Sequence, residues 1–339
     1  MRGSDTMITI KDVAKKAGVS ISTVSRVINN SKPVSNEIRQ RVLKIIEETG
    51  YTPNPLARSL VTKKSQLIGV IVPDISDFFM GELLNGIEEV GKIYDYDIVL
   101  CNSYGEPDEE LKYINLLKSK QVAGIIFVSW KMDQKHVDVI EKANIPAVYI
   151  SKNATEFDVY SVSINNFEAS YDMTKYLIKN GNTKIAFMKS SAQDNIMDSD
   201  RYRGFKKALE ESNIQMDETL VKEGDDTSES GYYLMSQILE SKNIPDAVFA
   251  SRDEIAVGVI NCILDAGYKV PEDISVSGYN DIKLASLYRP ALTTIKQPIY
   301  DMGAVSIRMI VKMINNEGLE DKKILLPYSL VERQSVQKK

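Results

Sequence analysis

The apolar residues of the first 50 positions recur with the period of a helix, in three short blocks. The pattern predicts helices over about 9–17, 21–29 and 36–48. Gly18 lies between the first two blocks, where a left-handed glycine can end a helix without steric cost. We expect N-caps at Thr9, Ser20 and Ser35, and inward-facing Val13, Ala14, Ala17, Val24, Val27, Ile28, Ile38, Val42, Leu43 and Ile46.

The second block carries a further stripe on the side away from its core, formed by Ile21, Ser22, Ser25, Arg26 and Asn29. Two short helices joined through a glycine, with a third that completes the core, follow the helix-turn-helix plan. The second helix then enters the major groove of DNA by its N-terminal end. Residues there must approach base edges, with one long donor for guanine, and Ile21, Ser22 and Arg26 have those characters. The alternative is a plain three-helix bundle with a solvated polar face.

From residue 67 onward, short apolar runs alternate with amphipathic helical stretches. Runs such as LIGVIVP, AGIIFVS and ISVSGYN are apolar almost throughout, which is typical of parallel strands covered on both faces. The pattern occurs twice and predicts two similar α/β lobes, at about 66–165 and 166–293. The fold class is therefore an all-α helix-turn-helix headpiece followed by two doubly wound parallel-sheet lobes.

Polar or aromatic residues follow most of the predicted strands, where ligands of open α/β sheets bind. Aromatic faces beside Asp, Asn and Arg suit the apolar face and hydroxyl groups of a sugar. The alternative is that Phe78 and Phe79 begin a helix and pack inward, and that Asp253 and Asp281 cap helices. The strand-end residues are Asp74, Asp77, Phe78, Phe79, Ser129, Trp130, Ser151, Ser190, Arg252, Asp253, Asn280 and Asp281.

Charge is unevenly distributed along the chain, whose net charge is -5. Residues 1–65 hold 12 Lys and Arg against 5 Asp and Glu, a balance of +7, which leaves 30 basic and 42 acidic residues, a balance of -12, in the remainder. A basic head on an acidic body indicates a nucleic-acid-binding module joined to another domain.

The composition indicates the cellular compartment in which we expect the protein. The two cysteines, Cys101 and Cys262, lie far apart and fit a reducing cytosol, so we expect a cytoplasmic protein. The chain contains no apolar run long enough to span a membrane, and MRGSDT is no signal peptide. We interpret residues 1–6 as the remnant of an expression tag, with the native start at Met7.

The residues offer no support for catalysis, so we expect no enzyme, metal or cofactor. His136 is the only histidine, and its stretch, MDQKHVDVIEKA, predicts a surface position. Neither cysteine has the CxxC partner of a metal site, and both are better explained as core residues.

One further segment points to a family. The order TIKDVAKKAGVSISTVSRVIN, a third helix, GYTPNPLARSL and then the strand LIGVIVPD resembles the LacI/GalR family of bacterial repressors over essentially the whole chain from Met7. The resemblance implies a headpiece over 7–52 and a hinge helix and linker over 53–65, with Leu60 wedged into the minor groove. It implies a homodimer on a near-palindromic DNA site, contacted by Thr9, Ser20, Ile21, Ser22, Thr23, Ser25, Arg26, Asn29, Asn54, Ala57, Arg58 and Leu60.

The resemblance also implies a core like that of periplasmic binding proteins. Residues 294–326 would return to the first lobe and residues 327–339 to the second. A small-molecule effector, a sugar or sugar phosphate, would bind between the lobes at Phe78, Phe79, Trp130, Arg201, Asp253 and Asn280.

The helix in QPIYDMGAVSIRMIVKMI places Asp301, Arg308 and Lys312 on one stripe, with methionines and isoleucines opposite. On pattern alone this stripe is a solvated face. Several stretches, however, are similar to the carbon-catabolite-control branch of the family, in which this helix binds the phosphocarrier protein HPr phosphorylated on serine. Arg308 would then contact the phosphate, Lys312 would support it, and Tyr300 and Asp301 would make further contacts.

The leading hypothesis is a dimeric DNA-binding regulator of carbon metabolism whose operator affinity is raised by serine-phosphorylated HPr. The second is a repressor released by a sugar or sugar phosphate, since DSDRYRGF and Trp130 resemble the sugar-responsive members. A third, a sugar-transport protein built on the same lobes, would require a secretion signal and no DNA-binding head.

Overall fold

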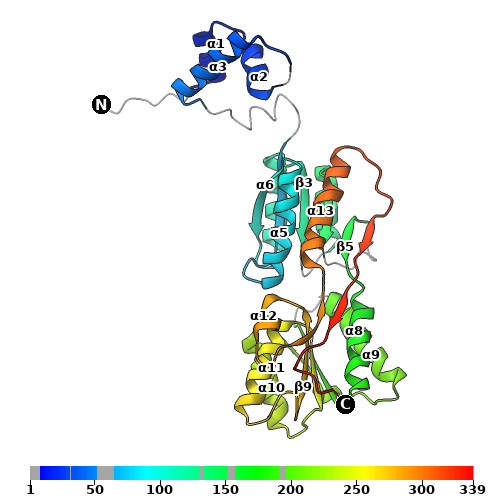
Figure 1. Ribbon diagram of the computed structural model, residues 1–339. Helices are drawn as coiled ribbons and strands as arrows, with labels where there is room; N and C mark the ends of the chain where they lie inside the picture. The colour runs from blue at the N-terminus through cyan, green and yellow to red at the C-terminus, as the bar shows by residue number, and fades with distance from the viewer. Residues whose placement is uncertain are drawn as a thin grey trace. The chain divides into compact units, whose positions relative to one another are not determined.

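The computed structural model describes residues 8–30, 32–51, 65–129, 133–150, 157–190 and 196–338. The chain forms two compact units, Met1–Ser65 and Gln66–Lys339, which are considered separately (Figure 1).

The first unit contains three helices: α1 (Ile10–Ala17), α2 (Ile21–Asn29) and α3 (Asn36–Thr49). Gly18 ends α1 at φ 64°, and its backbone N–H donates to the carbonyls of Ala14 and Lys15, so α2 can begin three residues later. Their core contains Val13, Ala14, Ala17, Val24, Val27 and Val42, with Ile28, Ile38 and Ile46 partly buried. The inward position expected for Leu43 is wrong, because its side chain is 44% exposed on the outer side of α3.

The second unit begins with a lobe whose sheet has six parallel strands in the order β11-β5-β4-β3-β1-β2. The strands are β1 (Leu67–Val72), β2 (Asp97–Asn102), β3 (Gly124–Val128), β4 (Ala147–Ile150), β5 (Ser161–Ser163) and β11 (Lys323–Leu325). The helices are α5 (Phe78–Ile93), α6 (Pro107–Ser119), α7 (Gln134–Ala143) and α13 (Ile299–Ile314).

The second lobe repeats this arrangement in a sheet ordered β12-β10-β9-β8-β6-β7, parallel except for β12 against β10. Its strands are β6 (Ile185–Ser190), β7 (Val221–Gly224), β8 (Ala247–Ala250), β9 (Ser275–Asn280), β10 (Thr293–Lys296) and β12 (Ser329–Val331). Its helices are α8 (Asn166–Lys179), α9 (Ile196–Glu211), η1 (Glu218–Leu220), α10 (Ser228–Glu240), α11 (Asp253–Asp265) and α12 (Lys283–Leu287).

Alternate residues of the inner strands enter different cores, which explains why those runs are apolar throughout. In β3, Ile126 and Val128 pack under α5 and α13, whereas Ile125 and Phe127 pack under α6 and α7. In the second lobe, one face packs against α10 and α11 and the other against α8 and α9. Figure 1 shows α5 beside α13 in the first lobe and α10 beside α11 in the second. The predicted pair of doubly wound lobes is confirmed.

Within the described residues the chain crosses between the lobes three times, after β5, β10 and β11. The return to the first lobe begins later than the expected position 294. Residues Thr294 to Lys296 still pair with β9 and β12 of the second sheet, so the crossing follows Lys296. A short strand pattern does not reveal which of two sheets the strand joins, because both sheets would bury the same residues.

Candidate functional site

The outward stripe of α2 is available for contact in the isolated headpiece. Ile21 is 44% exposed, and Ser22 and Arg26 are also exposed. Ser20 caps the helix, since its hydroxyl accepts from the backbone N–H of Thr23 at 3.1 Å. An apolar tip and a long donor therefore project from the first two turns of a capped helix, as a major-groove reader requires.

The remaining predicted DNA contacts fall into three groups. Thr9 lies at the start of α1, where its hydroxyl and backbone N–H both donate to Asp12. Thr23 and Ser25 are half-buried. The side chain of Asn29 and the residues Asn54, Ala57, Arg58 and Leu60 lie outside the described residues, so the expected minor-groove wedge remains a prediction.

A second candidate surface lies on α13. Asp301, Arg308 and Lys312 are exposed along one stripe, while Met302, Met309 and Ile310 are buried against the first sheet, as the spacing predicted. Cations separated by one turn on a rigid, half-buried helix form a suitable arrangement for a phosphate group.

Tyr300 differs from the other members of this stripe. Its side chain is half-buried, and its hydroxyl donates to Glu89 of α5 at 2.8 Å. That hydrogen bond is the main cause of the raised pKa of Tyr300. The tyrosine therefore ties α13 to α5, and the surface around it includes acidic residues of α5.

The third candidate surface lies at the carboxyl ends of the strands of the two sheets. Most of the predicted residues there contact other parts of the protein. Asp77 caps α5, so Phe78 and Phe79 form its first turn. Phe78 is 56% exposed, whereas Phe79 is 6% exposed and packs into the core of the first lobe, as the alternative of inward packing expected for Phe79. Trp130 lies outside the described residues.

Arg201 is also buried, at 2% exposure. Its guanidinium stacks on the ring of Tyr279 at 3.8 Å and donates to Asn166 and to the carbonyl oxygen of Ser251. The hydroxyl of Tyr279 donates to the same Asn166 oxygen at 3.0 Å. Arg201 thus connects α9 with β9 and the start of α8 and has the contacts of a structural residue.

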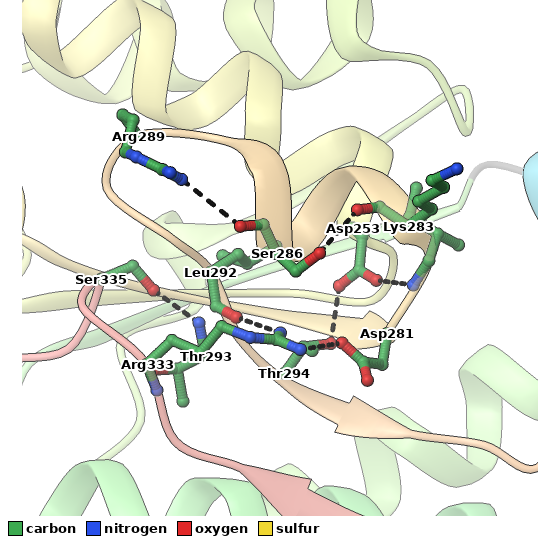
Figure 2. Close-up of polar contacts among 11 residues, drawn as sticks. Asp253, Asp281, Lys283, Ser286, Arg289, Leu292, Thr293, Thr294, Arg333 and Ser335 are labelled. Atoms are coloured by element: carbon green, nitrogen blue, oxygen red, sulfur yellow. Dashed lines mark hydrogen bonds and ion pairs between the residues drawn. The ribbon is translucent and has the colours of Figure 1, made fainter.

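Asp253 is fully buried, and both its oxygens accept hydrogen bonds from the protein (Figure 2). One accepts from the hydroxyl of Thr294 at 2.6 Å and the other from the backbone N–H of Ile282 at 2.8 Å. Burial raises the pKa of this carboxyl well above its ordinary value. Asp253 therefore connects α11 with β10 through its own hydrogen bonds, and its expected contact with an effector stays a prediction.

Asn280 and Asp281 end β9 with consecutive positive φ angles of 112° and 58°. The amide oxygen of Asn280 accepts from Gln297 at 2.7 Å, and the side chain is 2% exposed. Asp281 is paired with Arg333 of the C-terminal segment at 2.6 Å, a contact that Figure 2 shows beside Asp253. Neither residue is open to an effector in this structure, and the unusual backbone is held by these side-chain contacts.

Sequence reasoning named Arg252 and Asp77 only as residues that follow strands and did not predict that they meet. Arg252 Nη1 lies 3.1 Å from Asp77 Oδ2, and Arg252 Nε lies 3.1 Å from Asp226 Oδ2. Asp77 belongs to the first lobe, and Arg252 and Asp226 belong to the second. The only available signal was opposite charge at strand ends in different lobes, which does not specify a partner.

His136 is another correction, because it is fully buried and not at the surface. Its Nε2 lies 3.1 Å from Glu110 Oε2, and its Nδ1 lies 2.9 Å from Asp133 Oδ1. The ring also lies 5.4 Å from that of Phe127. A buried carboxylate on α6 supplies the partner that makes a buried imidazole tolerable on a helix with many charged residues.

In the described parts of the chain, no group of three or more His, Cys, Asp or Glu side chains is placed to hold a metal ion. Likewise, no described helix combines the length and apolar character required to cross a bilayer.

Comparisons with known proteins agree with this division of the chain. The model of the bacterial regulatory proteins of the lacI family matches residues 9–54, and that of the periplasmic binding protein-like domain matches residues 174–336. Catabolite control protein A of Priestia megaterium is 39% identical over 328 residues, covering 97% of this chain and 99% of the relative.

Two solved structures show the same architecture. The lac repressor dimer bound to operator and the anti-inducer ONPF has a TM-score of 0.89 at 27% identity, covering 97% of this chain and 99% of that chain. The complex of the transcriptional regulator CelR with cellobiose has a TM-score of 0.74 at 30% identity, with the same coverage. With its helix-turn-helix headpiece, its two-lobed core and a relative matched at 39% identity along nearly its whole length, this chain belongs to the LacI family of bacterial transcription regulators, close to catabolite control protein A.

Proposed function

We propose that this protein is a dimeric regulator of carbon catabolism that binds a near-palindromic operator more tightly when serine-phosphorylated HPr binds to α13. The observation that carries the proposal is the exposed stripe of Asp301, Arg308 and Lys312 on a helix whose opposite face is buried. The similarity to catabolite control protein A supports the same assignment.

The chemistry of this stripe fits a phosphoprotein. The guanidinium of Arg308 can bond a phosphate through two parallel N–H groups, and Lys312, one turn further along α13, adds positive charge. Asp301 and Tyr300 supply acidic and polar contacts for basic side chains of the partner.

The test is an operator-binding titration of the full chain with HPr that is either phosphorylated on serine or unmodified. Phosphorylated HPr should raise operator affinity by about tenfold, a typical coupling between two sites, and unmodified HPr should have little effect. Arg308→Ala should abolish the increase without changing the basal affinity. Arg203→Ala, which removes another exposed arginine from the second lobe, is the matched control. An unchanged operator affinity with phosphorylated HPr would contradict the proposal.

A second candidate is a repressor controlled by a sugar or sugar phosphate bound at the interlobe edge. Phe78, exposed at the carboxyl end of β1, could stack on a sugar ring, and the related regulator CelR has been solved with cellobiose. Calorimetry against sugars and sugar phosphates separates the two candidates, since a tight ligand that weakens operator binding favours the second. In that case Phe78→Ala should weaken binding of the ligand, because the other predicted contact residues are buried or lie outside the described residues.

A further inference from the structure

Arg252 occupies a position from which it reaches both lobes. It is the N-cap of α11, separated from β8 only by Ser251, and its extended backbone (φ -146°, ψ 154°) leaves the side chain free to turn away from the helix. Asp77 is the N-cap of α5 and follows β1 of the other sheet. Both residues therefore lie at the carboxyl ends of their strands, where the two sheet edges face each other.

The guanidinium joins three elements. Nη1 contacts Asp77 of the first lobe and Nε contacts Asp226 in the segment between β7 and α10, each at 3.1 Å. The side chain of Arg252 is 6% exposed and that of Asp77 is 11% exposed. Because solvent screens these charges little, the pair is unlike a surface ion pair of negligible energy.

A third acidic side chain, Glu254, lies near the guanidinium. Glu254 lies close enough to be influenced by the charges of Asp77, Asp226 and Arg252, and its buried Oε2 has no hydrogen-bond partner among the described residues. One cation thus balances acidic groups from both lobes. Without it, Asp77 of the first lobe and Asp226 of the second would have no guanidinium between them, and this attraction between the lobes would be lost.

Lobes of this kind rotate about their crossover segments and close on bound ligands. We propose that Arg252 is a built-in latch, which pairs with Asp77 to hold the lobes together at this edge. The contacts of Arg252 with Asp77 and Asp226 support the latch itself, and only its effect on operator binding rests on the proposed function.

Asp77→Asn is the sharpest test because it removes the charge and keeps the shape. Asparagine can still cap α5 by accepting from the backbone N–H of Phe79, as Asp77 does at 2.8 Å. Asp226→Asn is the matched control, since it removes the other carboxylate from the same guanidinium and leaves Asp77 opposite Arg252.

The readout is the distance distribution between spin labels at residues 118 and 240, exposed positions on α6 and α10, in the full chain. Cys101 and Cys262 are buried and would be replaced by serine in every variant. The parent should give one narrow distance population. Asp77→Asn should add a second, longer population, and Asp226→Asn should not.

Arg252→Gln should give the same second population. Adding Asp77→Asn to Arg252→Gln should cause no further change, because the ion pair is already lost in the single variant. Distances unaltered by Asp77→Asn would overturn the latch, as would an equal effect of Asp226→Asn. Operator titration of the same variants is a separate arm, in which Asp77→Asn should lower affinity about tenfold. Opened lobes with unchanged operator affinity would support the latch and overturn its link to DNA binding.

Discussion

Gly86 and Tyr300 touch through their backbones: a Cβ atom at residue 86 would overlap the carbonyl oxygen of Tyr300. The reciprocal contact exists at Gly303, where a Cβ would overlap the carbonyl oxygen of Leu83. Helices α5 and α13 therefore meet at glycine on both sides, and the surface proposed to bind HPr is built on this close crossing.

Adding one methyl group at this crossing of α5 and α13 should destabilise the folded protein. Gly86→Ala should lower the free energy of unfolding by about 1–3 kcal/mol, since neither backbone can move without disturbing the sheet beneath it. Gly81→Ala, in the same helix, is the control, because no atom lies within 4 Å of its added Cβ. That change should stabilise the helix by about 0.5–1 kcal/mol. Urea unfolding measures both, and equal effects would exclude close helix contact as the cause.

The buried pair of His136 and Glu110 should be essential to the first lobe. His136→Leu leaves the fully buried Glu110 carboxylate without its imidazole and should destabilise the protein by about 3–5 kcal/mol. Replacing both residues by leucine should be less harmful than replacing His136 alone. Lys112→Ala, which breaks an exposed pair with Glu109 on the same helix, should change stability by less than about 1 kcal/mol. Thermal unfolding of the three variants tests this order.

Glu254 should make stability depend on pH. Burial, followed by the charge of Asp77, raises the pKa of this carboxyl from 4.5 to about 7. Between these values the folded protein retains a proton that the unfolded chain has released, so the contribution to stability present below pH 4.5 is lost as the pH rises through 7.

Glu254→Gln has no such proton to lose. It should be more stable than the parent at pH 8 by up to about 3 kcal/mol, and the difference should vanish near pH 4.5. Denaturant unfolding of both proteins across this range provides the measurement. A constant difference at all pH values would show that the pKa of Glu254 is the same in the folded and unfolded protein.

Arg26 should contribute to sequence recognition. Arg26→Ala should weaken binding to the operator by about 1–3 kcal/mol and relax discrimination at one base pair. Arg203→Ala removes an equal charge from the core unit and should leave operator binding unchanged. Fluorescence titration against operators with single base changes measures both effects. A loss that is uniform over all operators would instead assign Arg26 to phosphate contact.

Leu60 should act through DNA shape. Leu60→Ala should reduce bending and specific binding more than non-specific binding, because an apolar wedge is used only where the duplex is kinked. Gel-shift titration with and without competitor, together with a bending assay, separates the two. Equal losses in both modes would argue against a wedge.

Much of the architecture was predictable because it depends on local periodicity. The spacing of Val13, Ala14, Ala17, Val24 and Val27 and the glycine at position 18 were sufficient for a helix-turn-helix core. Likewise, apolar strands between helices predicted doubly covered sheets, and the spacing of Met302, Met309 and Ile310 predicted the buried face of α13. Each of these features is a property of neighbours along the chain.

The contacts of the interlobe residues could not be predicted from the sequence, because they depend on partners far along the chain. Phe79 and Asp253 share the polar or aromatic character of residues at a ligand site, but one packs into a core and the other is held by Thr294 and Ile282. His136 lies among charged neighbours yet is buried beside Glu110.

The amino-acid sequence by itself determined the headpiece, the repeated α/β pattern, the exposed stripe of α13 and the family, since periodicity and motif order are written along the chain. Only the tertiary structure decided which strand-end residues bind other parts of the protein itself. It also decided that Arg252 contacts Asp77, which lies 175 positions earlier in the sequence. Charge and burial act through space, so a guanidinium and a carboxylate acquire their partners only when two separately folded sheets bring their edges together.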